Sequence, residues 1–261
     1  MIRVLVSGAG KMGRTIIDTV DREADLELAG VVDGLAQAAT LATPSGETRL
    51  FDDAQRACAE ARPDVVIDFT NAAWTPVIAD AALAHGVRLV IGTTGLSDAF
   101  IRRLAQQCKE KRIGGVVAAN FAVGAVLMMH MARVAAPFFE SAEIIELHHD
   151  QKADAPSGTS IATARAMMQA RRKPFARNVP EKQTIEGSRA AEVDGVTIHS
   201  VRLPGLVAHQ EVIFGGTGET LTIRHDSTGR ESFMPGVLLA VREVMKRDEL
   251  IVGLDRLIGL G

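Results

Sequence analysis

The chain has 261 residues, 47% of them hydrophobic and 23% charged, which is the composition of a globular protein with one or two domains. Its formal net charge is -3, so the basic excess of a nucleic-acid-binding surface is excluded. Aromatic residues make up only 4%, which leaves little material for stacking on single strands. The two cysteines, Cys58 and Cys108, have no metal-ligand spacing. They are interpreted as the reduced thiols of a cytoplasmic protein.

The first 120 residues alternate between short Val/Ile-rich segments and helical patterns. Strands are predicted at 2–7, 27–32, 64–69, 87–91 and 115–119. Helices are predicted near 11–23, 53–61, 73–85 and 97–111. The segment 41–48 contains Pro44 and Gly46 and is predicted to be a loop. This rhythm predicts an α/β fold with a Rossmann-type, doubly wound parallel sheet.

Two features bear on membranes and secretion. Met1 leads directly into the first predicted strand, so we expect no signal peptide. Residues 114–132 are almost entirely apolar and long enough to span a bilayer. Glycines and Asn120 interrupt this stretch, which favours a buried strand followed by a buried helix.

The pattern changes after residue 120. A helix is predicted over 122–139, a strand over 142–147 and a second helix from Ser157, followed by three strands at 196–203, 207–214 and 219–226. This predicts a second α+β domain with a mixed sheet over 122–230. The last helix, 231–246, returns to the first domain, which spans 1–121 and 231–261. The basic cluster 171–173 is predicted to end a helix, although a phosphate site is the alternative.

A glycine motif follows the first strand and opens the first helix. Gly8-Ala9-Gly10-Lys11-Met12-Gly13 matches G-x-G-x-x-G, in which the glycines allow a tight turn, a backbone approach to pyrophosphate and close helix packing. Asp33 lies 20 residues beyond Gly13, the spacing of a carboxylate that binds ribose hydroxyls. The sequence therefore predicts a dinucleotide site.

Later strand ends add further candidates, because ligands of such sheets bind outside the carboxyl ends of the strands. These candidates for ribose and nicotinamide contacts are Phe69, Thr70, Gly92, Thr93, Thr94, Ala118, Ala119, Asn120 and Phe121. Each segment alone is an ordinary turn, and it is their common sheet edge that suggests a shared role.

The stretch 147–159 carries the second set of candidates. His148 and His149 end a strand, Lys152 follows, and Ser157 is a predicted helix N-cap. The N–H groups of Gly158 and Thr159 would bind an anion beside Lys152, and a histidine can act as general acid or base. A metal site on the paired histidines is the alternative, but no Cys, Asp or Glu pattern completes it. No metal is predicted.

These motifs resemble the dihydrodipicolinate reductase family, also called 4-hydroxy-tetrahydrodipicolinate reductases, of bacterial lysine and diaminopimelate synthesis. The resemblance covers essentially the whole chain and is most specific over 146–149 and 155–159. It implies that His148 is the general acid/base and Lys152 the proton donor. It also implies that His149, Ser157, Gly158, Thr159 and Arg230 bind a cyclic dicarboxylate substrate. Family members are usually homotetramers built through the second domain.

The cofactor implied by the resemblance is NADH or NADPH. Many members carry arginine directly after the acidic residue, whereas this chain has Asp33-Gly34. A carboxylate without that arginine favours NADH, although Lys11 supplies a cation nearby, so we expect NADH to be used at least as well as NADPH. Two alternatives remain: a silent NAD-binding redox sensor, and a dehydrogenase of an amino-acid semialdehyde.

Overall fold

The structure is a computed structural model that describes residues 1–176, 179–180 and 182–260. The chain divides into two compact units, and each is described by itself. The first unit comprises Met1–Val123 and Arg230–Gly261, and the second comprises Gly124–Gly229. Arg230 therefore belongs to the first unit, whereas the sequence placed it at the end of the second domain.

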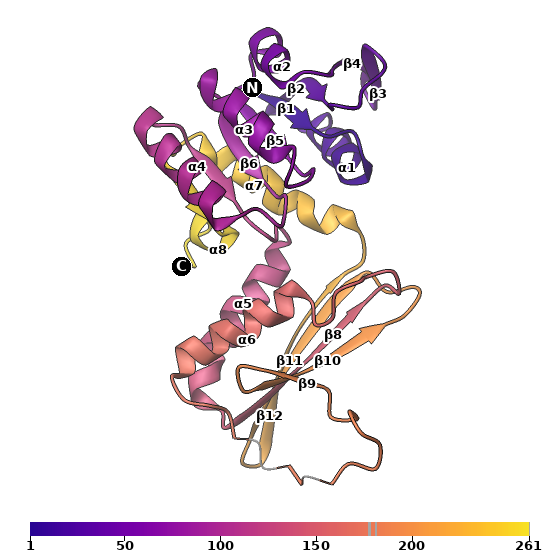
Figure 1. The fold of residues 1–261 in the computed structure, drawn as a ribbon, viewed down its shortest axis with the longest axis vertical. Coiled ribbons are helices and arrows are strands. Elements are labelled where there is room, and N and C mark those ends of the chain that lie inside the picture. The colour runs from indigo at the N-terminus through magenta and orange to yellow at the C-terminus, as the bar shows by residue number, and fades with distance from the viewer. Residues whose placement is uncertain (177–178, 181, 261) are drawn as a thin grey trace. The chain divides into compact units, whose positions relative to one another are not determined.

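The first unit is built on an eight-stranded sheet with the order β13-β7-β6-β5-β1-β2-β4-β3. Figure 1 shows β1 to β6 of this sheet. All neighbouring strands are parallel except β3 and β4, which are antiparallel. The strands are β1 (Ile2–Ser7), β2 (Leu26–Val32), β3 (Thr40–Thr43), β4 (Gly46–Phe51), β5 (Val65–Asp68), β6 (Arg88–Ile91), β7 (Gly115–Val117) and β13 (Leu250–Val252). The central strands are buried on both faces, which explains their continuous Val/Ile runs.

Helices cover both faces of this sheet. They are α1 (Lys11–Val20), α2 (Ala54–Ala61), α3 (Thr75–Ala84), α4 (Asp98–Lys111), α7 (Met234–Val244) and α8 (Leu254–Leu257), with the 3₁₀ turn η2 (Arg230–Phe233) before α7. One apolar cluster joins α2, α3 and α4 to one face of the sheet. On α4, for example, Phe100, Leu104 and Cys108 recur every four residues and are buried. The helix begins where Ser97 accepts a hydrogen bond from the N–H of Phe100.

The predicted loop over 41–48 is wrong. Most of it lies in the β3–β4 hairpin, and only Pro44 and Ser45 fall between the two strands. The strand β4 also pairs with β2, which brings Phe51 into the core, where it is 2% exposed. Proline and glycine are typical of turns, so Pro44 and Gly46 favour a loop in the local sequence, where the pairing with β2 is not visible.

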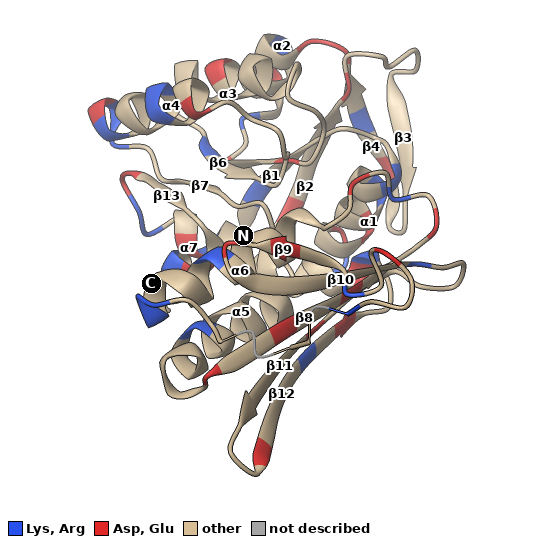
Figure 2. Cartoon of the chain, turned by 60° about the horizontal axis from the view of Figure 1, so that its bottom comes forward, with Lys and Arg blue, Asp and Glu red and all other residues tan. Residues whose placement is uncertain are grey.

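The second unit contains a five-stranded mixed sheet with the order β12-β11-β8-β10-β9. Its strands are β8 (Ser141–His148), β9 (Ala191–Val193), β10 (Val196–Arg202), β11 (Ala208–Gly216) and β12 (Glu219–Ser227). Two helices, α5 (Val123–Ala135) and α6 (Gly158–Arg171), and the turn η1 (Ala136–Phe138) complete it. Its apolar core joins the two helices to one face of the sheet. Figure 2 shows acidic and basic residues interspersed along these strands.

The apolar stretch 114–132 divides as predicted into the buried strand β7 and the helix α5. Of the helices in the described part of the chain, none combines the length and apolar character that a membrane span requires. The strand β13 and the helix α8 were not predicted, because three and four residues are too few to show a period. The parallel first sheet and the mixed second sheet confirm the predicted fold class.

The basic cluster 171–173 does end a helix, as predicted, since Arg171 is the last residue of α6 and Arg172 is its C-cap. The Arg171 side chain is buried, donates to the backbone oxygens of Ala136 and Phe139, and stacks on the ring of Phe175. This residue therefore fastens α6 to η1.

Candidate functional site

The glycine loop between β1 and α1 needs its glycines for space. Gly8 has a φ of +94°, and a Cβ there would lie 2.7 Å from Cγ2 of Thr70. A Cβ on Gly13 would lie 2.0 Å from the carbonyl oxygen of Gly8, so α1 packs directly against the turn before it. The N-cap of α1 is Gly10, which has no side chain to occupy the first backbone N–H groups. These groups therefore suit an anion.

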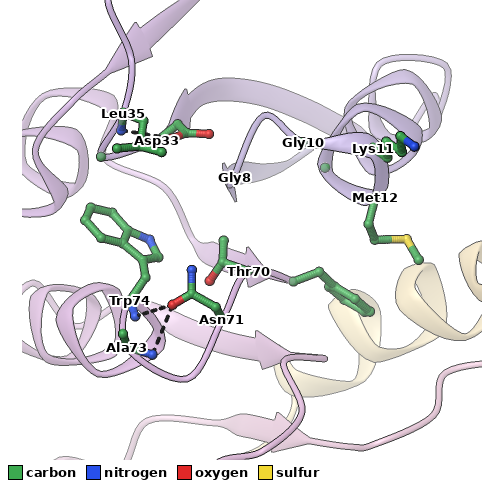
Figure 3. Close-up of a pocket in the computed structure, with 13 residues that line it drawn as sticks. Gly8, Gly10, Lys11, Met12, Asp33, Leu35, Thr70, Asn71, Ala73 and Trp74 are labelled. Carbon is green, nitrogen blue, oxygen red and sulfur yellow. Dashed lines mark hydrogen bonds between the residues drawn. The ribbon is translucent and has the colours of Figure 1, made fainter. Parts of the chain in front are cut away.

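A cavity of about 540 Å³ opens beside this loop (Figure 3). It lies at the carboxyl ends of β1, β2 and β5, where the strand order switches direction. Eight predicted cofactor residues line it: Gly8, Gly10, Lys11, Met12, Gly13, Asp33, Phe69 and Thr70. Five further lining residues were not predicted: Gly34, Leu35, Asn71, Ala73 and Trp74.

The Asp33 carboxylate is fixed by two backbone groups. One oxygen accepts a hydrogen bond of 2.8 Å from the N–H of Ala9, and the other accepts one of 3.0 Å from the N–H of Leu35. Ala9 thus orients the acid, although it does not itself line the cavity. A carboxylate offers about four acceptor positions, so two remain for ribose hydroxyls.

A buried carboxylate supports the loops below the cavity. Asp68, at the end of β5, is 0% exposed and accepts hydrogen bonds from four hydroxyl groups. These come from Ser7 at 2.7 Å, Thr70 at 2.8 Å, Thr75 at 2.6 Å and Thr93 at 2.9 Å. The role of Asp68 is therefore to hold the ends of three strands together.

The remaining predicted cofactor residues lie outside the cavity lining. They are Gly92, Thr93, Thr94, Ala118, Ala119, Asn120 and Phe121. Thr93 is buried and its hydroxyl also accepts from the N–H of Thr70. A Cβ on Gly92 would lie 2.1 Å from the ring of Phe69, which also packs against Phe121 with 5.1 Å between ring centroids. A cofactor contact at these seven positions stays a prediction.

The second group of candidates lies at the end of β8 in the other unit. His148 and Glu146 point to the same face of the strand, and a carboxylate oxygen of Glu146 lies 2.5 Å from Nδ1 of His148. The Glu146 side chain is 0% exposed, whereas that of His148 is 14% exposed. Burial alone would raise the pKa of Glu146. Hydrogen bonds from His148, Arg202 and Ser200 outweigh burial and lower this pKa to about 2.

Arg202 completes this cluster from the neighbouring strand. It pairs with His148 in the register of β10 and β8, and its guanidinium donates to both oxygens of Glu146, at 2.9 and 2.8 Å. The same guanidinium donates to the backbone oxygen of Asp154 at 2.6 Å. A bidentate pair of this kind fixes the direction of the carboxylate and also holds the loop after β8.

The start of α6 lies against the same carboxylate. Ser157 is the N-cap, as predicted. Its hydroxyl accepts from the N–H of Ser160 at 3.2 Å, and its own N–H donates to Glu146 at 3.3 Å. The Ser157 side chain is thus used inside the protein. At Gly158 a Cβ would meet nothing within 4 Å, so the backbone there faces open space, as an anion site requires.

Lys152 forms an ion pair with Asp154 that was not predicted from the sequence. Its Nζ lies 2.7 Å from a carboxylate oxygen of Asp154, and this hydrogen bond lowers the pKa of Asp154. Lys152 is 22% exposed and its N–H donates to the backbone oxygen of His149. His149 and Thr159 lie at the surface of this cluster, exposed and half-buried respectively.

The structure therefore brings His148, His149, Lys152, Ser157, Gly158 and Thr159 together in the second unit. Arg230 is exposed and belongs to the first unit. In residues 1–176, 179–180 and 182–260, no group of three or more His, Cys, Asp or Glu side chains is arranged to hold a metal ion.

Sequence reasoning missed several residues of both groups. Glu146 carried a usable signal, because residues two apart on a strand share a face. Asp154 stands two residues after Lys152 and was also within reach. No local sequence pattern indicates that Arg202 or Trp74 belongs to a site. The position of Arg202 depends on the register of β10 with β8, and that of Trp74 depends on where α3 begins.

The chain is similar to known proteins over nearly its whole length. The family model for the N-terminus of dihydrodipicolinate reductase matches residues 2–121, and the model for its C-terminus matches residues 124–258. The 4-hydroxy-tetrahydrodipicolinate reductase of Geobacillus kaustophilus is 49% identical over 262 aligned positions, which cover 98% of this chain and 99% of the relative.

Solved structures agree. A dipicolinate-bound dihydrodipicolinate reductase from Paenisporosarcina sp. TG-14 matches with a TM-score of 0.87 and 41% identity, covering 98% of this chain and 99% of that one. The aspartate semialdehyde dehydrogenase II of Vibrio cholerae matches with a TM-score of 0.55 and 10% identity, covering 95% and 99% of the two chains. That likeness concerns the fold alone. The family models, the curated relative and the dipicolinate-bound structure agree, and the chain belongs to the dihydrodipicolinate reductase family.

Proposed function

We propose that this protein reduces 4-hydroxy-tetrahydrodipicolinate to tetrahydrodipicolinate in the diaminopimelate route to lysine, with NADH or NADPH. The reaction consumes one hydride and one proton and releases one water. The observation that carries the proposal is the cluster in which Glu146 and Arg202 hold His148 beside the open start of α6. The named relatives and the dipicolinate-bound homologue support this substrate class.

The first unit fits a dinucleotide. The glycine loop has the shape that a pyrophosphate requires, and Asp33 keeps free acceptor positions for ribose hydroxyls. When bound, the nicotinamide supplies the hydride. The protein's part is to bind, to orient and to supply the proton.

His148 and Lys152 are the proposed proton-handling groups. A neutral imidazole has one N–H, and the Glu146 carboxylate beside Nδ1 holds that proton there. Nε2 is then left to exchange a proton with the substrate as general acid or base. The ammonium of Lys152, turned by Asp154, is the proposed proton donor to the product.

The substrate carries two carboxylates. The N–H groups of Gly158 and Thr159 at the start of α6 form the proposed site for one of them, with Lys152 and His149 beside it. Ser157 contributes by holding this helix start in place. We assign Arg230 to substrate binding on the resemblance alone.

The semialdehyde dehydrogenase alternative is disfavoured by the state of both thiols. That chemistry needs a reactive thiolate, or a different set of lysines. Burial, with a smaller contribution from the charge of Asp53, raises the pKa of Cys58 to about 11. Burial also raises the pKa of Cys108 to about 11. Both thiols are buried and unpaired, which supports the proposal that the enzyme works in the reducing cytoplasm. A silent sensor only binds the dinucleotide, so its function would not require the ordered cluster around His148.

We also propose a homotetramer assembled through the second unit. Ile144, Ile198 and Val212 pack under the helices, so the alternate residues Ile145 and Ile213 lie on the other face of the sheet. Both are only half-buried in the single chain, which supports a partner on that face. Light scattering after gel filtration tests it, and a monomer would contradict it.

The decisive experiment is an absorbance assay at the NAD(P)H band. The substrate is generated in situ by condensing aspartate semialdehyde with pyruvate. We expect oxidation of the dinucleotide only when both precursors are present. The Lys152→Ala variant is the control for background oxidation. A purified enzyme that binds dinucleotide but never oxidises it with this substrate would favour the sensor alternative.

A further inference from the structure

Trp74 forms one side of the cavity in the first unit, next to Asp33 (Figure 3). It precedes α3, and its backbone N–H donates to Oδ1 of Asn71 at 3.0 Å. The indole is only half-buried, so part of it remains available to a ligand. No part of the proposed chemistry uses this side chain.

The indole is held in a fixed position. Its Nε1–H donates to Oγ of Ser7 at 2.9 Å, and the Ser7 hydroxyl donates in turn to the buried Asp68 at 2.7 Å. The residue also packs against the apolar cluster that joins α2, α3 and α4 to the sheet. A ring restrained in this way cannot swing aside without breaking a partly buried hydrogen bond.

The position of this ring explains why residue 34 is glycine. A Cβ on Gly34 would lie 2.7 Å from Cζ3, 3.1 Å from Cη2 and 3.3 Å from Cε3 of Trp74. The φ of Gly34 is outside the left-handed region, so its backbone would accept another residue. The space taken by the indole, and not the backbone conformation, therefore requires glycine here.

The charges around this point favour a neutral ligand group. The Asp33 carboxylate is fixed toward the cavity by Ala9 and Leu35. Among the thirteen described residues of the lining, Lys11 is the only one with a cationic side chain, and it is exposed on α1. A 2′-phosphate would bring a charge of about -2 beside the carboxylate, and only a mobile lysine could offset the repulsion.

We propose that Trp74, held over Gly34, is the residue that makes this cavity select an unphosphorylated adenosine ribose. The indole occupies the space in which a cationic side chain at position 34 would have to lie to bind a 2′-phosphate. Asp33 is thereby left as the side chain that contacts the ribose, and its carboxylate accepts hydrogen bonds from the ribose hydroxyl groups. This inference rests on the proposed dinucleotide site and assigns the choice between NADH and NADPH to a named pair of residues.

The chain offers a direct binding assay, because Trp74 is its single tryptophan and it has no tyrosine. The probes are 5′-AMP and adenosine 2′,5′-bisphosphate, which lack the nicotinamide and its absorbance. We expect 5′-AMP to change the emission of Trp74 and to bind at least as tightly as the bisphosphate. An enzyme that binds 5′-AMP by calorimetry without any change in emission would place the indole away from the adenosine, against the proposal.

Four variants test the exclusion itself, with calorimetry for binding and melting temperature for stability: Gly34→Ala, Gly34→Arg, Trp74→Ala and Gly34→Arg/Trp74→Ala. Gly34→Ala adds only a Cβ, so we expect it to destabilise the wild-type protein but not the Trp74→Ala protein. Gly34→Arg alone should leave the preference between the probes within about threefold. Combined with Trp74→Ala, it should shift that preference toward the bisphosphate by roughly tenfold to 100-fold, the strength of a charge-assisted pair.

The outcomes separate this inference from the proposed function. If Gly34→Arg shifts the preference equally with and without Trp74, the indole does not exclude a side chain and the proposal is wrong. The same holds if the wild type prefers the bisphosphate by tenfold or more while it still reduces its substrate. Failure of the proposed function would look different, because neither NADH nor NADPH would be oxidised with the substrate while the probes and the four variants would still report the ribose preference. If neither probe bound to the wild type, the dinucleotide site and this inference would both be wrong.

Discussion

Glu146 and His148 stand two residues apart on β8 and share one face, with 2.5 Å between the Glu146 carboxylate and Nδ1 of His148. Because Glu146 is completely buried and tied to Arg202, its position is set by the fold and not by solvent. The imidazole therefore receives both its orientation and the location of its proton from a residue that solvent does not reach.

We predict that Glu146→Gln lowers kcat by roughly tenfold to 100-fold, with a smaller change in KM. The amide keeps the shape of the side chain, but its NH₂ or its oxygen faces Nδ1 without the negative charge that stabilises a protonated imidazole. A steady-state profile from pH 5 to 9 provides the measurement.

Glu143→Gln is the matched control. Glu143 lies on the same strand, points to the opposite face and pairs with His199 at 2.7 Å, so the chemical change is identical. That pair is partly exposed, and we expect kcat to stay within about twofold of the wild type. Because Glu143 lies on the face proposed for subunit contact, gel filtration must show an unchanged oligomeric state for this control. Equal losses in both variants would mean that any carboxylate on β8 matters and that Glu146 has no special role.

We predict that His148→Ala lowers kcat more than it raises KM, by a factor on the order of 10² to 10⁴. A general acid/base acts mainly in the transition state, so ground-state binding should suffer less. Initial rates over a range of substrate concentrations measure both constants. A variant with nearly normal kcat would transfer the role to Lys152 or to water.

Pyridine-2,6-dicarboxylate is a flat, unreactive compound with two carboxylates, and we expect it to compete with the substrate. Lys152→Ala should weaken its binding by roughly one to two powers of ten, because a charge-assisted hydrogen bond is lost. NADH binding, measured by titration, should be almost unchanged, since Lys152 and the dinucleotide cavity lie in different units. Asp154→Asn is the control, because it removes the partner of Lys152 and keeps the ammonium.

Two results would count against this placement of the substrate. One is a wild-type enzyme that the dicarboxylate fails to inhibit. The other is a Lys152→Ala protein that no longer binds NADH.

The buried Glu146 also predicts a loss of stability in acid. Folding lowers its pKa from 4.5 to about 2, so between these values the unfolded chain binds more protons than the native protein. The stabilisation is fully present above about pH 5 and is lost as the pH falls toward 2, with a total on the order of 3 kcal/mol. Urea unfolding at pH 7, 4 and 3 measures the decline. Glu146→Gln, already less stable at pH 7, should lack this part of the slope, and an unchanged slope would show that other carboxylates cause it.

Local patterns were enough to predict much of the first unit. The spacing of Gly8, Gly10 and Gly13 after a strand predicted the loop, and the distance to Asp33 predicted the acid at the cavity. Such features depend on backbone geometry within one βαβ segment, where sequence distance and spatial distance agree. The same is true of Ser157, which caps the helix that directly follows it.

The contacts that were missed join distant parts of the chain. Arg202 reaches Glu146 through the parallel register of β10 and β8, and no residue near position 202 encodes that register. Trp74 meets Gly34 because the end of β2 and the start of α3 lie at the same edge of the sheet. The hairpin of β3 and β4 was missed for a similar reason, since its pairing partner is β2.

Asp68 carries one further consequence. The hydroxyls of Ser7, Thr70 and Thr93 belong to the ends of three different strands, and all of them donate to this one carboxylate. If one of these three strand ends moved away by itself, the buried Asp68 carboxylate would lose a hydrogen-bond donor. The opening of one strand end is therefore opposed while the other two stay in place. The edge of the sheet that holds the cavity should therefore fluctuate as one cooperative unit, and its local unfolding should have a single free energy.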